Sequence, residues 1–203
     1  PSRGLGDVYK RQVRNMAKKD KITGDLSKDF DTEGKLEFCK LDLLNDAGWD
    51  AAMEGCDYVL HVASPFINKE PKDENLYIKP AVEGTQRALK AAKKAGIKRM
   101  VLTSSMVSML GDADESIEMN QSSWTNVHSK NVSAYAKSKT LAEKSAWKFI
   151  KEQDKPSPLE LVVVNPGPVF GPTLSGDLSG ASMGMYRDLI LGKMPMLPQA
   201  SIN

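Results

Sequence analysis

The 203-residue sequence has no long apolar run, little net charge, and few cysteines and histidines. No stretch reaches the roughly 18 consecutive apolar residues that a membrane-spanning helix needs. No basic segment followed by an apolar one opens the chain, so we predict no secretory signal. With 28 Lys and Arg against 26 Asp and Glu, the formal net charge is +2, which gives no general attraction for nucleic acid. We therefore expect a cytoplasmic protein without a nucleic-acid or membrane partner.

Cysteine and histidine are each present only twice. Cys39 and Cys56 do not have the spacing of zinc ligands, and we interpret them as reduced, structural thiols. His61 lies in an apolar segment and His128 in a polar one, and neither is predicted to be catalytic. The sequence therefore predicts no metal site.

The chain alternates between predicted strands and predicted helices. The strand segments are 36–43, 57–64, 99–105 and 159–165, of which the last three are nearly continuous apolar runs, typical of buried parallel strands. Helical patterns cover 46–54, 80–96 and 134–153, with Pro80 placed in the first turn of its helix. This alternation predicts right-handed βαβ units, and so an α/β fold with a doubly wound parallel sheet.

The helix predicted at 134–153 carries an unusual lysine. Tyr135 and Lys139 are four residues apart and share one helix face. Lys139 falls in an otherwise apolar stripe, whereas four lysines are predicted on the opposite, solvated face: Lys137, Lys144, Lys148 and Lys151. A lysine in the stripe must be paired or face a polar cleft, because burying a lone charge is costly. The alternative is that Lys139 reaches solvent from the stripe's edge and Tyr135 is an ordinary core residue.

Four segments resemble, in order and spacing, the extended short-chain dehydrogenase/reductases. They are GCDYVLHVASPF (55–66), AVEGTQRALKAAKKAGIKRMVLTSS (81–105), SAYAKSKTLAEKSAW (133–147) and VNPGPVFGPTL (164–174). Within that family the chain is similar to the dihydroflavonol 4-reductase, cinnamoyl-CoA reductase and aldehyde reductase group, from about Val13 to its end. The resemblance implies a Rossmann-like fold and the NADPH-dependent reduction of an aldehyde or ketone, with NADH as the alternative cofactor.

The resemblance also implies a catalytic set of Ser105, Tyr135 and Lys139. In such a set a tyrosine donates a proton to the carbonyl oxygen as hydride arrives, and a serine hydroxyl binds the same oxygen. The ammonium of Lys139, one helical turn away, is expected to lower the pKa of Tyr135 from its ordinary value of about 10. Lys139 is further expected to bind the nicotinamide ribose.

Cofactor contacts follow from the same resemblance. Arg14 is placed where related enzymes hold the 2′-phosphate of NADPH, because guanidinium donors fit phosphate oxygens in pairs. Lys21 is expected to assist, the alternative being a solvated charge. Asp42 and Leu43 are expected near the adenine. The remaining expected contacts lie along the cofactor and near its nicotinamide: Val62, Ala63, Ser64, Ser104, Tyr135, Lys139, Pro166, Gly167 and Val169.

Three regions are predicted along the chain. Residues 1–12 match nothing in the family and are interpreted as a non-native leader. Residues 13–172 are predicted to form a partial NAD(P)-binding domain, and 173–203 the truncated start of a substrate-binding region. The family's first βαβ unit, with its glycine-rich loop, and most of the small C-terminal domain are expected to be absent. The chain is therefore interpreted as an inactive fragment, in which the strand at 57–64 borders an open edge or an uncovered face.

Two other functions stay open from the sequence. A nucleotide-sugar epimerase or dehydratase of the same superfamily shares the Ser, Tyr and Lys set. A non-catalytic NAD(P)-sensing protein on the same fold is the other alternative, although such relatives commonly lose the tyrosine or the lysine. The expected partner is a small carbonyl substrate, in a monomer or a homodimer.

Overall fold

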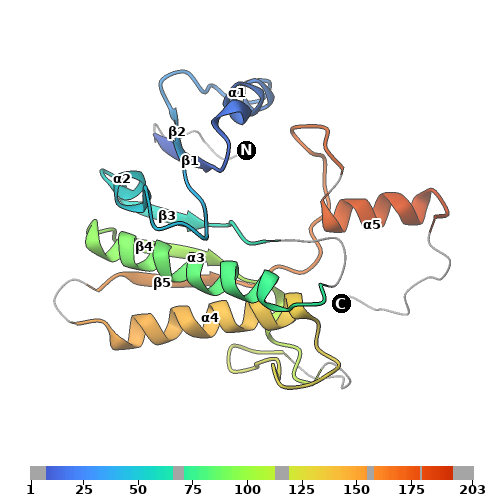
Figure 1. The fold of residues 1–203 in the computed structure, drawn as a ribbon. Helices are drawn as coiled ribbons and strands as arrows, with labels where there is room; N and C mark the ends of the chain where they lie inside the picture. Colours follow the sequence, from blue (N-terminus) through green and yellow to red (C-terminus); the bar gives the residue numbers. More distant parts are fainter. Residues whose placement is uncertain (1–7, 66–70, 113–118, 155–157, 179, 194–203) are drawn as a thin grey trace.

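The computed structural model describes residues 8–65, 71–112, 119–154, 158–178 and 180–193, and every strand in these ranges is parallel to its neighbours (Figure 1). The strands are β1 (Tyr9–Val13), β2 (Leu36–Lys40), β3 (Tyr58–His61), β4 (Arg99–Thr103) and β5 (Glu160–Val164). The α-helices are α1 (Lys19–Leu26), α2 (Trp49–Met53), α3 (Asn75–Lys94), α4 (Ala134–Glu152) and α5 (Ala181–Ile190). The 3₁₀ turns η1 (Met16–Lys18) and η2 (Met106–Ser108) complete the order.

The described strands form two sheets. β1 pairs with β2, and β4 lies between β3 and β5 in a three-stranded sheet. Tyr58 is opposite Arg99 in the register of β3 and β4, and Arg99 is opposite Glu160 in that of β4 and β5. The predicted parallel α/β class is confirmed. The sequence predicted a single sheet rather than two. Apolar patterns show where strands lie, but they do not show which strands pair.

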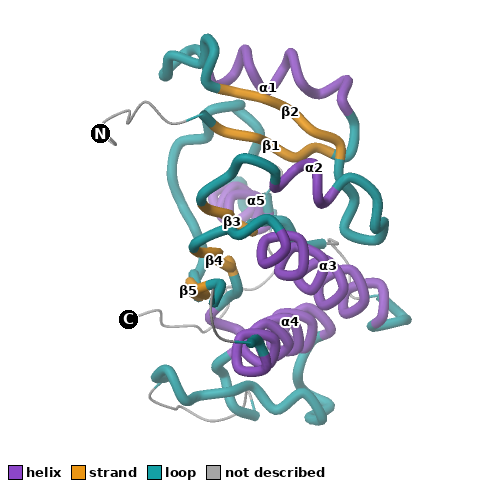
Figure 2. The backbone as a smooth tube through the Cα atoms, turned by 90° about the vertical axis from the view of Figure 1, so that its left-hand side faces the viewer, coloured by secondary structure: helices purple, strands orange, loops and turns teal. Residues whose placement is uncertain are grey.

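Helices α3 and α4 run side by side against one face of the three-stranded sheet (Figure 2). The core between these layers contains Met100 and Leu102 from β4, Leu89 from α3 and Leu159 before β5. Full burial of one such side chain stabilises the fold by about 1.5 to 3 kcal/mol. The alternate residues of the strands face away from the helices and are exposed: Tyr58, Leu60, Val62, Val162 and Val164. The expectation of an uncovered apolar face beside 57–64 is thus met in the described part of the chain.

Helix α3 begins at Asn75, five residues before the predicted start, so the placement of Pro80 in a first turn is wrong. An interior proline removes a helical hydrogen bond and costs about 3 kcal/mol. The extra turn buries Tyr77, whose ring packs edge-on against that of Tyr135 with centroids 6.0 Å apart. This packing offsets the cost of Pro80 and supports the first turn of α4.

Part of the leader predicted for residues 1–12 is folded, since residues 9–12 form β1 together with Val13. Tyr9 lies opposite Leu36, and the Tyr9 amide donates to the Lys35 carbonyl at 2.7 Å. The strand has mostly exposed side chains, so its sequence carries no apolar alternation that would have revealed it. That residues 1–12 are non-native, and the other two domain boundaries, stay predictions.

Cysteines, metal-binding groups and membrane-spanning helices can each be checked among the described residues. Cys39 and Cys56 are partly buried, free thiols. No three His, Cys, Asp or Glu side chains within these residues are grouped so that they could hold a metal ion. None of the helices described is both long and apolar enough to cross a bilayer.

Candidate active site

The first predicted catalytic residue, Ser105, lies between β4 and η2. It has extended backbone geometry and caps the turn, because its Oγ accepts a hydrogen bond from the Val107 amide at 3.4 Å. Ser105 is 8% exposed, and its side chain is close enough to the phenol of Tyr135 to lower the pKa of that phenol. The structure therefore joins the end of β4 to the first turn of α4.

Tyr135 lies in that first turn, which is capped by the Ser133 hydroxyl accepting from the Ala136 amide at 3.1 Å. The pKa of Tyr135 is raised, chiefly because burial disfavours the phenolate; the hydrogen bond with Ser105 opposes this rise, and nearby Tyr77 adds to it. The predicted lowering by Lys139 is wrong for this structure. The Lys139 ammonium lies 5.9 Å from the centre of the Tyr135 ring, and it is not among the causes that shift this pKa. Tyr135 is therefore set up to hold its proton.

Lys139 is buried, at 6% exposure, so the alternative in which it reaches solvent is excluded. Its Nζ donates a hydrogen bond to the main-chain carbonyl of Thr103, the last residue of β4, at 3.1 Å. Burial lowers the pKa of Lys139 from 10.5 to about 8. The predicted solvated face of α4 needs a correction too, because Lys137 is largely covered and pairs with Glu74 at 2.6 Å.

A small cavity of about 10 Å³, enough for about one water molecule, adjoins Lys139. His61, Ser64, Ser104 and Glu143 are among the residues that line it. The pKa of His61 is lowered to about 4 by burial and by the positive charge of Lys139, so His61 is neutral near pH 7. The Ser64 hydroxyl oxygen is buried without a hydrogen-bond partner. Such a group needs a ligand or a water, because leaving it unpaired costs free energy.

The predicted nicotinamide-side residues gather at the carboxyl ends of β3, β4 and β5. The Met106 amide, after β4, donates to the Pro166 carbonyl, after β5, at 2.9 Å. A Cβ atom on Gly167 would lie 3.2 Å from the Met106 sulfur, so only glycine fits without a shift. After β3, Val62 and Ala63 are exposed, and Val169 beyond β5 is exposed as well. These strand ends offer accessible backbone next to Ser105 and Lys139, which suits the close approach of a flat ligand.

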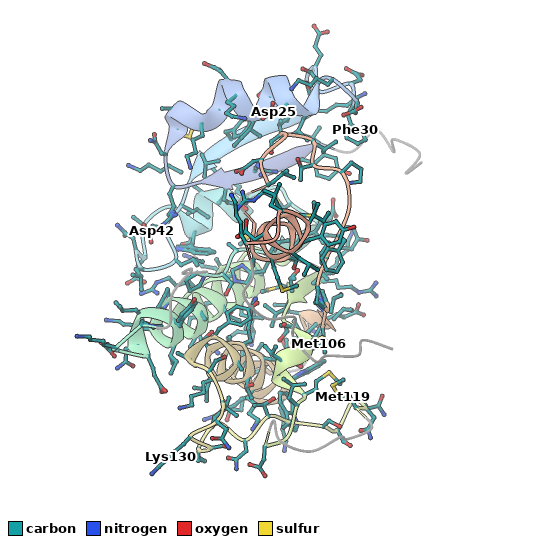
Figure 3. The ribbon with its side chains drawn as sticks, turned by 90° about the vertical axis from the view of Figure 1, so that its right-hand side faces the viewer. Asp25, Phe30, Asp42, Met106, Met119 and Lys130 are labelled. Carbon is teal, nitrogen blue, oxygen red and sulfur yellow. The ribbon has the colours of Figure 1, made fainter. Side chains whose placement is uncertain are left out.

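The predicted adenine-side residues lie apart from this set, beside the β1–β2 sheet. Figure 3 labels Asp42 and Met106, which mark the turns after β2 and β4. The Leu43 carbonyl accepts from Arg87 on α3 at 2.7 Å, so the Asp42–Leu43 turn is tied to α3. Arg14 is exposed in a bend directly after β1. Lys21, on α1, forms an ion pair with Asp25 at 2.6 Å, which agrees with the alternative of a surface charge.

These features together fit a dinucleotide laid across the strand ends. An exposed arginine at position 14, a fixed turn at Asp42–Leu43, the Ser64 hydroxyl that has no partner among the described residues, and the buried Lys139 lie on successive elements of a parallel α/β fold. In such folds ligands bind at the carboxyl ends of the strands. The residues present therefore suit an NAD(P) molecule, whose nicotinamide would lie nearest Ser105 and Tyr135.

Sequence reasoning missed three polar residues beside this set: Ser108, Glu143 and Asn165. Their side chains are hydrogen-bonded to one another, with Glu143 accepting from both neighbours at 2.9 Å. A signal for Glu143 was available, because it continues the four-residue spacing from Tyr135 and Lys139 along one helix face. Ser108 and Asn165 carried no comparable signal, since only the tertiary fold brings the turns after β4 and β5 together.

Known proteins similar to this chain include several reductases. Tetraketide alpha-pyrone reductase 1 of Arabidopsis thaliana is 40% identical over 149 residues, which cover 71% of this chain and 44% of that protein. Cinnamoyl-CoA reductase CAD2 of Medicago truncatula is 34% identical over 177 residues, covering 83% of this chain and 52% of that protein. The chain thus spans about half the length of the curated relatives it matches.

Solved structures agree with these relatives. The structure of Gre2 from Candida albicans in complex with NADPH superimposes with a TM-score of 0.75 at 26% identity, over 96% of this chain and 60% of that one. Vestitone reductase from alfalfa (Medicago sativa) gives a TM-score of 0.70 at 26% identity, over 90% of this chain and 55% of that one. The chain also matches the NAD dependent epimerase/dehydratase family over residues 6–198, a match that starts upstream of Val13, where the resemblance was predicted to begin. The chain belongs to the NAD dependent epimerase/dehydratase family, and its similarity to plant reductases within it confirms the predicted resemblance.

Proposed function

We propose that the protein containing this chain is an NADPH-dependent reductase that converts an aldehyde or ketone to an alcohol. The observation that carries the proposal is the meeting of Ser105, at the end of β4, with Tyr135 in the first turn of α4, beside the buried Lys139 that is anchored to Thr103. The named reductases among the relatives, and the NADPH complex of Gre2, support the same chemistry.

The reaction needs one hydride and one proton. Bound NADPH would supply the hydride, with its electron pair, to the carbonyl carbon and so be oxidised to NADP⁺. Tyr135 donates its phenolic proton to the carbonyl oxygen, and the Ser105 hydroxyl donates a hydrogen bond to the same oxygen as negative charge develops there. The raised pKa of Tyr135 supports this direction of transfer, because the residue holds a proton until a stronger base forms beside it.

Lys139 takes part through its charge and its position. Its Nζ is anchored to the Thr103 carbonyl, which leaves two of its three ammonium hydrogens for other acceptors. Hydroxyl groups of a bound cofactor near the ends of β3 and β4 would provide such acceptors. Ser64, with its unpartnered oxygen in the same cavity, would bind the cofactor from the β3 side.

The proposal is tested by following NADPH oxidation with a panel of aldehydes and ketones, beside a panel of nucleotide sugars. The protein should be expressed from a gene that includes any coding sequence flanking this chain, and then purified. Turnover of carbonyl compounds with consumption of NADPH is expected. Turnover of nucleotide sugars without net consumption of cofactor would show an epimerase or dehydratase instead, and cofactor binding without turnover of either panel would show a sensing protein.

A further inference from the structure

A buried network of polar side chains joins helix α4 to the turns that follow β4 and β5. Glu143 lies one helical turn beyond Lys139 and is 7% exposed. One of its carboxylate oxygens, Oε2, accepts from Ser108 Oγ and from Asn165 Nδ2, both at 2.9 Å. Ser108 is fully buried in η2, and Asn165 directly follows β5. The network therefore connects three segments that carry the proposed catalytic and nicotinamide-side residues.

The donors and acceptors of this network balance. Asn165 Nδ2 lies 3.2 Å from the main-chain carbonyl of Ser105 and 2.9 Å from Ser108 Oγ, and Ser108 Oγ lies 2.8 Å from the same carbonyl. The amide has two hydrogens and the hydroxyl one, and the acceptors are the Glu143 carboxylate, the Ser105 carbonyl and the Ser108 oxygen. Three hydrogens serve five contacts, so these do not all form at once. When Ser108 and one Asn165 hydrogen are donated to Glu143, the second Asn165 hydrogen is left for the Ser105 carbonyl, and Ser104 Oγ, 3.5 Å from Ser108 Oγ, donates to Ser108. An ionised carboxylate only accepts, so it determines which way the other two groups point.

Ser105 is held from two sides by this arrangement. Its carbonyl lies within hydrogen-bond distance of Ser108 Oγ and Asn165 Nδ2, while its side chain lowers the pKa of the Tyr135 phenol. Asn165 also fixes the turn at Pro166, whose carbonyl accepts from the Met106 amide at 2.9 Å. An apolar side chain at position 143 could fill the same space at a lower desolvation cost, but it could not direct these donors.

We propose that Glu143, with Ser108 and Asn165, forms a positioning network that sets Ser105 against Tyr135. The three residues do not contact the reacting atoms; they act through Ser105 and through the turn at Pro166. The role in turnover rests on the reductase function proposed above. The geometric role does not, because the network's contacts with the Ser105 carbonyl are present without cofactor.

The first experiment therefore needs no activity. The pKa of Tyr135 is measured by NMR titration of carbon-13-labelled tyrosine in the wild type and in Glu143→Leu, Asn165→Leu and Glu143→Gln. Ser105 lowers this pKa, so displacement of Ser105 in the two leucine variants should make Tyr135 titrate at higher pH than in the wild type. Glu143→Gln keeps an acceptor oxygen and should stay close to the wild type. Glu152→Leu, an exposed position at the end of the same helix, is the matched control.

The second experiment measures kcat, KM and NADPH affinity for the same variants. Misplacement of a catalytic group by about 1 Å costs on the order of 10²-fold in rate. We expect kcat to fall by about 10- to 10²-fold in the leucine variants, with little change in NADPH affinity, and to be largely retained in Glu143→Gln. An unaltered Tyr135 pKa in both leucine variants, or equal kcat in all four proteins, would overturn the proposal. If no protein reduces any carbonyl compound, the proposed function fails while the titration still decides the geometric role.

Exchanging the two side chains at positions 143 and 165 separates an effect on positioning from an effect on stability. This experiment can also be used if the leucine variants do not fold. In the double variant Glu143→Gln/Asn165→Asp, the amide and the carboxylate exchange places, so the bond between the two positions is restored. The carboxylate at position 165 cannot donate to the Ser105 carbonyl. The double variant should therefore recover the Tm lost in Asn165→Asp, but neither the Tyr135 pKa nor kcat. Recovery of all three together would show a purely structural network.

Discussion

The ammonium of Lys139 donates a hydrogen bond to the carbonyl of Thr103 at 3.1 Å, which fastens helix α4 to the carboxyl end of β4, the central strand of the three-stranded sheet. Ser105, two residues beyond Thr103, is thereby brought next to Tyr135, one helical turn before Lys139. The buried ammonium is costly, and its lowered pKa of about 8 shows that burial opposes the charge. The position of Lys139 is thus maintained by packing and by one carbonyl, in a place where a cofactor hydroxyl would supply further acceptors.

Replacement of Tyr135 by phenylalanine tests the proton donor. Tyr135→Phe keeps the ring and its packing against Tyr77 but removes the hydroxyl that is bonded to Ser105. We expect kcat for carbonyl reduction to fall by about 10² to 10⁴-fold, as is typical for loss of a general acid. NADPH affinity, measured by calorimetry, should be retained. A phenylalanine variant with turnover near that of the wild type would show that another group donates the proton.

The lowered pKa of Lys139 predicts a pH-dependent stability. The unfolded lysine titrates near 10.5 and the folded one near 8, so between these values the unfolded chain holds a proton that the folded chain has lost. The free energy of unfolding should therefore rise with pH across this window, with a slope of at most about 1.4 kcal/mol per pH unit from this group. Denaturant unfolding of the wild type and of Lys139→Met at a series of pH values isolates the effect. The stability difference between the two proteins should shift in favour of the wild type as the pH rises; a constant difference would contradict the prediction.

The sequence predicted the fold class and the grouping of the three proposed catalytic residues, but not the contacts that position them. Parallel strands, the long helices and the grouping of Ser105, Tyr135 and Lys139 follow from apolar patterns, helical spacing and the family resemblance. The pKa of Tyr135 was predicted in the wrong direction, because spacing shows that a lysine is near but not that burial outweighs its charge. The early start of α3 was hidden by Pro80, whose local preference is overridden by the packing of Tyr77. Asn165 and Ser108 contact Glu143 only because of the tertiary fold, so no local sequence pattern predicts these hydrogen bonds.

Gly84 on α3 is predicted to be essential for the turn that carries Leu43. A Cβ atom at Gly84 would lie 2.7 Å from Leu43 Cδ2 and 3.0 Å from Leu43 Cβ, and the second of these atoms cannot move without the backbone. Gly84→Ala should therefore lower the free energy of unfolding by about 1 to 3 kcal/mol. Gly24→Ala on α1 is the matched control, because nothing lies within 4 Å of its added Cβ. The control should stabilise the protein by roughly 0.5 to 1 kcal/mol. Equal effects of the two substitutions in thermal or denaturant unfolding would show that the Leu43 turn is free to move.

Arg14 is predicted to select NADPH over NADH. It lies exposed in the bend after β1, with Arg11 also exposed on the preceding strand as a matched control. Only NADPH carries a 2′-phosphate, and a hydrogen bond to a charged group contributes about 1.5 to 3 kcal/mol. Arg14→Ala should thus weaken NADPH binding by roughly 10- to 150-fold and leave NADH binding nearly unchanged, while Arg11→Ala should change neither by more than about twofold. Calorimetric titration of both cofactors into the three proteins measures these affinities directly.

The salt dependence of binding supplies a second check. Added salt screens a surface charge, so it should reduce the preference of the wild type for NADPH over NADH more than that of Arg14→Ala. Equal weakening of the two cofactors in Arg14→Ala would instead assign this arginine a structural role at the end of β1.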